Sequence, residues 1–368
     1  MASRTRSAFK RKFAILLVLL LAEAFFPPLP CRGETGTEAD PLHGIDLWYG
    51  SSQTLGQPGL AQSRFNVLGN IGQPRSVTRM TFSVNGGPEI PLHLGPDQRR
   101  LVSAGDFNIE LTPAALLPGE NRLRISAERS GDPPLVAHAV ITRAPGTWPL
   151  PYHVDWKRVH RVQEAVQVVD GRWRLDSDGL RTHPNHIGYD RVVAVGEVTW
   201  TDYEVLVVFR VHRIDPSAWG SKISVAPWLG VNLRWLGHTD HPVICPQPRC
   251  GWFPTGGSCS YEFGKNDCNR LKLVTGRYLE SIRSKCAPDL EPDRRYWMRA
   301  RVETLEQGHL YRFKFWKDGD PEPGSWSLQS IAPAITLPQG GFLLVAHHAD
   351  VTFGNLTVTP LGHSKGTR

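Results

Sequence analysis

After its first 24 residues the sequence lacks any apolar run of about 18 residues or more, the length that suggests a membrane-spanning helix. The chain is 368 residues long, which is enough for two ordinary domains, each with its own hydrophobic core. We therefore expect two domains and no stable membrane span once the N-terminal segment has been removed.

No run of Lys and Arg is present outside that N-terminal segment. The whole chain carries a net charge of +7, from 42 basic and 35 acidic residues. Removal of residues 1–24 would leave 37 basic and 34 acidic side chains, a net charge of +3. A nucleic-acid partner requires a large cationic surface, so we expect no nucleic acid to be bound.

Residues 1–24 have the three regions of a signal peptide in the usual order. A basic stretch precedes the apolar run Phe13–Ala22, and the small residue Ala24 follows. The apolar run is about half as long as a membrane span, which favours cleavage over a retained anchor. The segment predicts a secreted or periplasmic protein whose mature N-terminus lies between about Phe25 and Thr35.

The six cysteines are also unevenly placed. Cys31 lies near the expected mature N-terminus, and the other five lie close together without the C-x2-C spacing typical of zinc sites. In an oxidising compartment such a cluster predicts a disulfide framework, with at least two bridges inside it and Cys31 as a candidate partner for the fifth cysteine. The clustered candidates are Cys245, Cys250, Cys259, Cys268 and Cys286.

Sustained helical periodicity is absent as well, and short runs alternate apolar with polar residues between Gly, Pro and Asn turns. We predict an all-β protein made of an immunoglobulin-like β-sandwich followed by a larger jelly-roll sandwich. The expected segments are a signal peptide at 1–24, a linker at 25–43, the first sandwich at 44–143, a linker at 144–155, the larger sandwich at 156–361 with a Cys-rich insertion at 237–291, and a tail at 362–368.

The first block carries a distinctive turn between two strand patterns. The strand Phe107–Leu111 is followed by Leu117-Pro118-Gly119-Glu120-Asn121 and then by an alternating run that extends to Ala127. This block resembles bacterial immunoglobulin-like domains, in which a turn of the form L-x-P-G-x-N leads into a late strand. The resemblance implies the fold of the block and almost nothing about its function.

Three segments of the larger block carry a second resemblance: Trp200–Arg210, Tyr311–Gly319 and Gly340–Thr359. They resemble concanavalin A-like (laminin G-like) jelly-roll domains of secreted bacterial proteins. In that fold the last strand returns beside the first and closes the sandwich. Such domains include lectins, glycan-binding modules and glycoside hydrolases, so the resemblance implies a glycan or cell-surface polymer as partner.

The sequence also lacks the spacing of carboxylates that is typical of catalytic jelly-roll domains. Glycoside hydrolysis uses two carboxyl groups about 5 to 9.5 Å apart, and the E-x-D-x-x-E pattern of jelly-roll glucanases is absent. Of the nearest candidates, Asp202 and Glu204 share one strand face, whereas Glu197 would lie on the other. A glycoside hydrolase or polysaccharide lyase is therefore an alternative hypothesis, as is a structural or adhesion module that binds protein.

Metal-ligand patterns are incomplete. His238, Asp240 and His241 offer suitable atoms for a transition metal, but loop residues of this kind are commonly only polar. The acidic group Asp318–Glu322 offers oxygen ligands for calcium without the full spacing of a calcium loop. We expect no transition-metal cofactor and keep calcium as a candidate.

Polar and charged side chains share one parity along several expected strands and so must face water or a ligand. These sets are Arg210 with His212, Asn232 with Arg234, Arg299 with Arg301 and Glu303, and Arg312 with Lys314. Planar hydrogen-bonding groups and aromatic rings hold sugars, and an arginine-rich groove would favour acidic glycans. The leading hypothesis is a secreted, non-catalytic protein that binds carbohydrate or cell surfaces. Its predicted ligand-binding residues are Arg234, Trp235, His238, Asp240, Trp252, Arg210 and Asn232.

Overall fold

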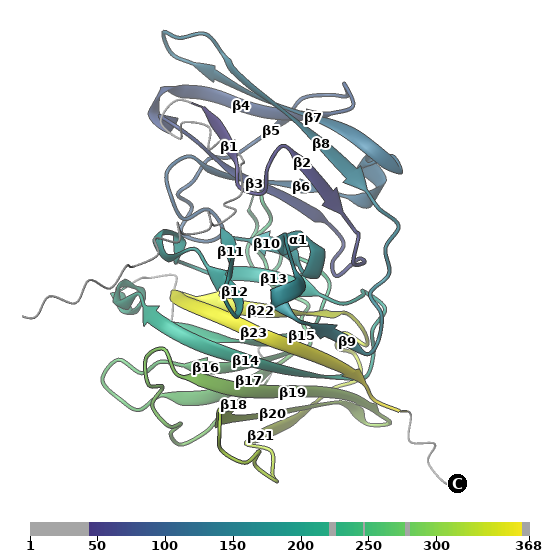
Figure 1. Cartoon of the computed structure of the whole chain (residues 1–368), viewed down its shortest axis with the longest axis vertical. Helices are drawn as coiled ribbons and strands as arrows, with labels where there is room; N and C mark the ends of the chain where they lie inside the picture. The colour runs from purple at the N-terminus through teal and green to yellow at the C-terminus, as the bar shows by residue number, and fades with distance from the viewer. Residues whose placement is uncertain (1–43, 221–225, 246, 277–279, 363–368) are drawn as a thin grey trace, which may run out of the picture. The chain divides into compact units, whose positions relative to one another are not determined.

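The computed structural model describes residues 44–220, 226–245, 247–276 and 280–362. The chain divides after residue 37, and the second unit, which is compact, contains every described residue. The predicted signal peptide and Cys31 lie outside the described residues. Four sheets form two sandwiches within the second unit (Figure 1).

The smaller sandwich pairs a three-stranded with a five-stranded sheet. The first sheet has the order β1 (Ile45–Leu47), β3 (Phe65–Ile71), β6 (Asp106–Leu111). The second has the order β2 (Ser52–Leu55), β8 (Leu135–Arg143), β7 (Gly119–Arg129), β4 (Val77–Val84), β5 (Ile90–Pro91). Only the β2–β8 pair among these is parallel.

Turn chemistry explains where these strands end. Asn85 and Gly86 have φ of 52° and 73°, the positive values that a tight hairpin between β4 and β5 requires. The buried Asn121 side chain accepts a hydrogen bond from the Leu117 N–H at 2.8 Å and donates to the Leu117 carbonyl at 2.9 Å. The Leu117–Asn121 turn that the sequence singled out is therefore tied together by its own asparagine.

The larger sandwich has a seven-stranded and an eight-stranded sheet, both antiparallel. The seven-stranded order is β10 (Gln167–Asp170), β13 (Arg191–Val195), β22 (Gly341–His347), β15 (Trp228–Trp235), β16 (Gly257–Glu262), β17 (Arg270–Thr275), β18 (Glu280–Arg283). The main path of the other is β11 (Trp173–Asp176), β12 (Gly179–Thr182), β23 (Ala349–Pro360), β14 (Tyr203–Ile214), β19 (Arg295–Leu305), β20 (Gly308–Lys317), β21 (Leu328–Ala332).

The last strand closes this sandwich, as the sequence predicted. β23 pairs with β14, the first strand of the predicted pattern, and also with β9 (Tyr152–Val154), which lies in the segment predicted as a linker. The only α-helix in the described part of the chain is α1 (Val162–Ala165). Short 3-10 turns lie at Pro74–Ser76, Pro113–Ala115, Trp156–Arg158, Pro184–His186 and Pro216–Gly220. The predicted all-β sandwich class is thus confirmed.

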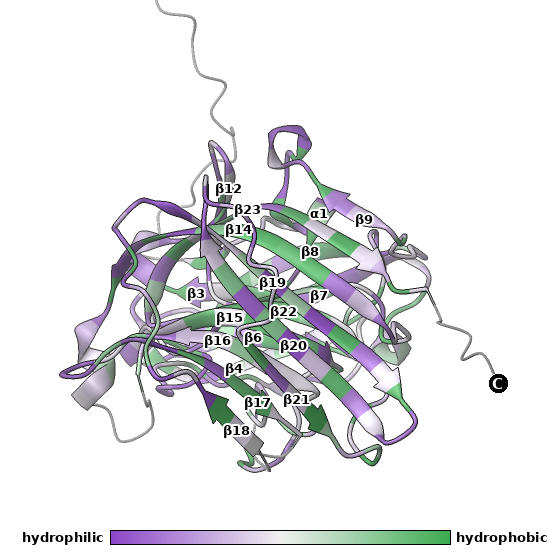
Figure 2. Cartoon of the chain, turned by 90° about the horizontal axis from the view of Figure 1, so that it is seen from below, coloured by the Kyte–Doolittle hydropathy of each residue, from purple (hydrophilic) through white to green (hydrophobic). Residues whose placement is uncertain are grey.

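Period-two alternation positions the side chains of the eight-stranded sheet. Tyr296, Met298 and Ala300 of β19 are buried in the core, whereas the residues between them are partly exposed. Hydrophilic and hydrophobic colours accordingly alternate along β19 and β20 (Figure 2). One face of this sheet forms the core and the opposite face is polar. Among the described residues, no helix is both long and apolar enough to cross a membrane.

Candidate functional site

The polar face of the eight-stranded sheet, on β14, β19 and β20, collects aromatic and charged side chains. β19 and β20 pair in a register that sets Trp297 opposite Trp316, and β14 contributes Glu204 opposite Arg301. We call this surface the tryptophan–arginine face. It comprises Trp297, Trp316, Trp326, Arg299, Arg301, Arg312, Lys314, Glu204, Glu303 and Glu322.

Two pairs of cations lie directly opposite each other on this face. Arg299 is the cross-strand partner of Lys314, and Arg301 is the partner of Arg312. Like charges directly opposite each other destabilise a sheet.

Three carboxylates separate these cations, and each contacts two of them. Glu204 pairs with Arg299 and, at 2.7 Å, with Arg301. Glu303 lies 2.8 Å from Arg312 and 3.8 Å from Arg301.

Glu322 lies 2.6 Å from Lys314 and 2.9 Å from Arg299. Partial burial alone would raise the pKa of Glu322, but the hydrogen bond from Lys314 and the charge of Arg299 hold that pKa below its ordinary value.

The three tryptophans of the face are half-buried, and two of them, Trp316 and Trp326, contact its cations. The rings of Trp297 and Trp316 stack with their centroids 6.4 Å apart and an interplanar angle of 19°. Lys314 Nζ lies 5.0 Å from the Trp326 ring centroid, and Arg301 Cζ lies 5.3 Å from it. Both contacts fall within the range of cation–π attraction. The face thus combines aromatic surface with fixed hydrogen-bonding groups.

The structure gives Arg234 a different place from the exposed ligand surface that the sequence predicted. Its side chain is fully buried at 0 % exposure, and its guanidinium donates to the Thr201 carbonyl at 3.0 Å and to Asp202 at 3.0 Å. Arg234 has φ of 52°, and the pairing of β15 with β22 shifts register between Leu233 and Trp235. Every residue of β15 from Leu229 to Trp235 is buried, so both faces of this strand are covered and parity could not predict an exposed arginine.

Trp235, His238 and Trp252 do come together, but mostly inside the protein. The Trp235 ring centroid lies 5.3 Å from that of His238 and 6.0 Å from that of Trp252. Trp235 is 0 % exposed and His238 is 4 % exposed, whereas Trp252 is half-buried. Of these three, only Trp252 presents appreciable surface, because the other two pack into the core.

The remaining predicted ligand-binding residues do not join this cluster. Asn232 is buried on β15. Arg210 lies on β14 in the other sheet and donates to Asp178 at 2.9 Å. Asp240 is exposed and lies 3.6 Å from Arg249. The seven residues therefore do not form one solvent-facing site.

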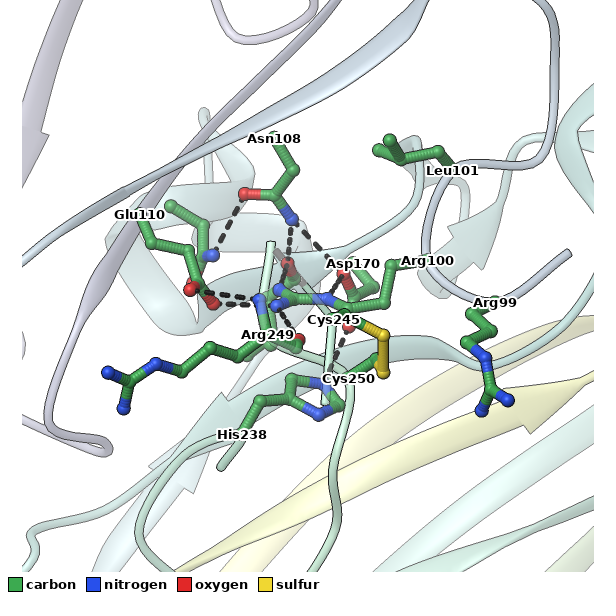
Figure 3. A network of polar contacts seen from close by, with 12 residues as sticks. Arg99, Arg100, Leu101, Asn108, Glu110, Asp170, His238, Cys245, Arg249 and Cys250 are labelled. Carbon is green, nitrogen blue, oxygen red and sulfur yellow. Dashed lines mark hydrogen bonds and ion pairs between the residues drawn. A yellow bond between two sulfur atoms is a disulfide. The ribbon is translucent and has the colours of Figure 1, made fainter. Parts of the chain in front are cut away.

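His238 instead belongs to a buried polar network that joins the two sandwiches (Figure 3). Its Nε2 lies 3.0 Å from Asp170 Oδ2, at the end of β10. Arg100, from the loop before β6, reaches Asp170 and Glu110 at 2.6 Å each. Asn108 donates to the Val169 carbonyl at 2.9 Å. We call Arg100, Asn108, Glu110, Asp170 and His238 the buried network.

The surroundings of two residues in the buried network, Arg100 and Asp170, favour their charged forms. Burial alone would lower the pKa of Arg100, but the carboxylates of Asp170 and Glu110 raise it above its ordinary value. Burial alone would raise the pKa of Asp170, but Arg100 and His238 lower it. Glu110 also accepts from the Arg249 N–H at 3.1 Å, so the network holds the backbone next to Cys250. The side chains of the network therefore hold β6, β10 and the backbone at Arg249 together.

Two disulfides lie in the insertion, which confirms the minimum number predicted there. Cys245 bonds to Cys250 and Cys268 bonds to Cys286. Cys259 is a buried thiol on β16, and burial raises its pKa. Core residues surround Cys259. Its pairing with Cys31 stays a prediction, because Cys31 lies outside the described residues.

The candidate catalytic carboxylates have structural partners. Glu197 accepts from the backbone N–H groups of Trp148 at 2.7 Å and Leu60 at 3.3 Å. Asp202 accepts from Arg234 and from the Thr304 N–H, the latter at 2.6 Å. These contacts bind chain segments to one another.

No group of three or more His, Cys, Asp or Glu side chains in the described part of the chain is arranged to hold a metal ion. Asp318 of the calcium candidate accepts from the Trp297 indole N–H at 2.7 Å and lies 3.2 Å from Arg295. Binding of calcium there stays a prediction.

Sequence reasoning identified the cations of the tryptophan–arginine face but missed its tryptophans as site residues. Trp297 precedes Arg299 by two positions, and Trp316 follows Lys314 by two. The same parity that grouped the charged residues could have added both rings. Trp326 carried no such signal because it lies outside the strands, between β20 and β21.

No protein-family model matches the chain, and no curated protein sequence matches it significantly. Among solved structures, the Ca²⁺/Man2-bound exoplasmic/lumenal domain of VIP36 is similar with a TM-score of 0.36 and 12% identity, over 53% of this chain and 82% of that one. Peanut lectin with a 9mer peptide has a TM-score of 0.38 and 8% identity, over 57% and 97%. A bifunctional GH43-CE protein of Bacteroides eggerthii has a TM-score of 0.38 and 11% identity, over 82% and 40%. At these values the likenesses carry no functional inference.

Proposed function

We propose that this protein is a secreted or periplasmic, non-catalytic carbohydrate-binding protein and that the glycan binds on the tryptophan–arginine face. The observation that carries this proposal is the gathering of three half-buried tryptophans and four cations on one polar sheet face. Sugars stack their apolar faces on aromatic rings and hydrogen-bond to planar charged groups. Both kinds of group lie side by side here.

The charge of the face supports a preference for acidic glycans. Arg299, Arg301, Arg312 and Lys314 outnumber the three carboxylates by one. A positive excess raises the local concentration of anionic ligands. The carboxylates remain available to accept hydrogen bonds from sugar hydroxyls.

The state of these carboxylates favours binding over catalysis. A general acid in glycoside hydrolysis needs a carboxyl group whose pKa is raised. The pKa of Glu322 is lowered by its cationic neighbours, and Glu204 and Glu303 each contact two arginines. Such carboxylates orient cations and accept hydrogen bonds.

Export is part of the proposal. Two disulfides fit an oxidising compartment such as the periplasm or the extracellular space. The measurement is the intact mass of the exported protein, which should correspond to cleavage between about Phe25 and Thr35. Retention of Met1 in exported protein would contradict this part.

A glycan array carrying neutral and acidic oligosaccharides, followed by calorimetry with the best ligand, tests the binding site. Trp316→Ala should weaken binding by about 2 kcal/mol, roughly 30-fold, with little change in melting temperature. Trp252→Ala is the matched variant, because Trp252 is also half-buried but lies at the sequence-predicted site. Loss of binding in Trp252→Ala with normal binding in Trp316→Ala would move the site to Trp252. A protein that binds no glycan on the array and captures a protein ligand would replace the proposal with the adhesion hypothesis.

A further inference from the structure

A separate cavity of about 240 Å³ lies at the edge of the seven-stranded sheet, where the Cys-rich insertion forms the β16–β17 hairpin. This volume is below the ~300 Å³ at which sites for drug-sized ligands begin, and suits a single small ring. Its aromatic and charged lining residues are Trp219, Glu262, Phe263, Lys265, Asp267, Arg270 and Arg283. Of the two carboxylates, Glu262 is held by Lys272 at 2.6 Å, outside the lining.

Several contacts fix the wall of this cavity. The Gly264 N–H donates to the Asn269 side chain at 2.9 Å, and Asn269 donates to Asp289 at 2.7 Å. The Cys268–Cys286 disulfide ties the hairpin loop to the segment after β18. A wall fixed before binding loses little conformational freedom when a ligand arrives.

The cavity offers both aromatic surface and available positive charge. Trp219 and Phe263 are half-buried, and the buried Trp219 indole N–H has no acceptor among the described residues. Lys265 is exposed and has no ionic partner in the described part of the chain. Arg283 approaches Glu262 only at 3.7 Å, whereas Arg270 pairs closely with Asp267 at 2.7 Å. Two of the three cations can therefore receive a new anion.

We propose that this cavity is a second ligand site, for a carboxylated monosaccharide of the uronic acid class. The sugar ring lies against Trp219 and Phe263, and its carboxylate faces Lys265 and Arg283. Aromatic contact selects a ring with an apolar face, and the two cations select an acid over its neutral counterpart. This site goes beyond the tryptophan–arginine face and does not depend on glycan binding there.

The test titrates the full chain with glucuronate, glucose and benzoate, and follows tryptophan fluorescence and calorimetric heat. Glucuronate should bind, and glucose should bind at least about fivefold more weakly, since it lacks the charge. Lys265→Gln and Arg283→Gln should each weaken glucuronate about three- to fivefold, and the double variant about tenfold. Higher ionic strength should weaken glucuronate binding.

Matched controls separate this site from the other. Lys285→Gln removes an exposed lysine of the same stapled segment that does not line the cavity, and should bind glucuronate normally. Loss of glucuronate binding in Trp316→Ala but not in Lys265→Gln would assign the acid to the tryptophan–arginine face and overturn the second site. Equal binding of glucose, stronger binding of benzoate, or no detectable binding of glucuronate would overturn it as well.

Discussion

The buried network and the tryptophan–arginine face use the same chemistry in two environments. Arg100 in the network is 2 % exposed and contacts Asp170, which is 0 % exposed. Arg312 on the face is 26 % exposed and contacts Glu303, which is 28 % exposed. Both arginines pair with carboxylates at short distances, so contact geometry alone does not separate their roles.

Solvent exposure separates them. A buried charge that loses its partner stays desolvated, which costs several kcal/mol. An exposed charge that loses its partner returns to water at little cost. Arg312 can therefore exchange its carboxylate for a ligand, whereas Arg100 and Asp170 hold the two sandwiches together.

The largest expected effect follows from Arg100→Ala. This change leaves Asp170 and Glu110 buried without their shared cation, and we expect a loss of about 3–5 kcal/mol in the free energy of unfolding. Urea unfolding followed by fluorescence measures it. Arg124→Ala is the control on the same sandwich, because Arg124 is 42 % exposed and pairs with the equally exposed Glu89. Arg124→Ala should lower the free energy of unfolding by less than about 1 kcal/mol. Similar losses in the two variants would contradict the difference between buried and exposed arginines.

Low pH should reduce the stability contributed by the buried network more than that contributed by the tryptophan–arginine face. The pKa values of Asp170 and Glu322 are both lowered in the folded protein. Each therefore contributes stability above its unfolded pKa, near 3.8 for Asp and 4.5 for Glu, and that stability is lost as pH falls toward the lower folded value. The buried Asp170 should dominate this loss.

Free energies of unfolding measured from pH 7 to about pH 2 test this expectation. Asp170→Asn should be less stable than the unmodified chain at neutral pH, and the difference should shrink as the pH falls below the carboxyl range. Glu322→Gln should follow the unmodified chain closely. A difference for Asp170→Asn that is constant with pH would show that its carboxylate charge is not what stabilises the network.

Alternation was sufficient to predict much of the fold. Strand runs such as Phe107–Leu111 and the return of the final strand beside β14 appear where the sequence placed them. Period-two patterns report which face of a strand is buried, because successive side chains point to opposite sides. The cations of the face were found by this rule.

The same rule fails on a strand whose two faces are both covered. Asn232 and Arg234 share a parity on β15, but every residue of that strand from Leu229 to Trp235 is buried. The buried network was also missed, because Arg100 and Asp170 are 70 residues apart and meet only when the two sandwiches pack. Long-range packing of this kind leaves no local signature.

The smallest expected effect concerns the pair Arg312–Glu303. A double-mutant cycle with Arg312→Gln and Glu303→Gln should give a coupling energy of about 0.2–1 kcal/mol in unfolding, and less at high salt, because water and ions screen exposed charges. Arg312→Gln should nevertheless weaken acidic glycans more than neutral ones. A coupling energy as large as the loss expected for Arg100→Ala would mean that the Arg312–Glu303 pair is structural. If Arg312→Gln binds acidic glycans as tightly as the unmodified chain does, Arg312 does not belong to the ligand-binding face.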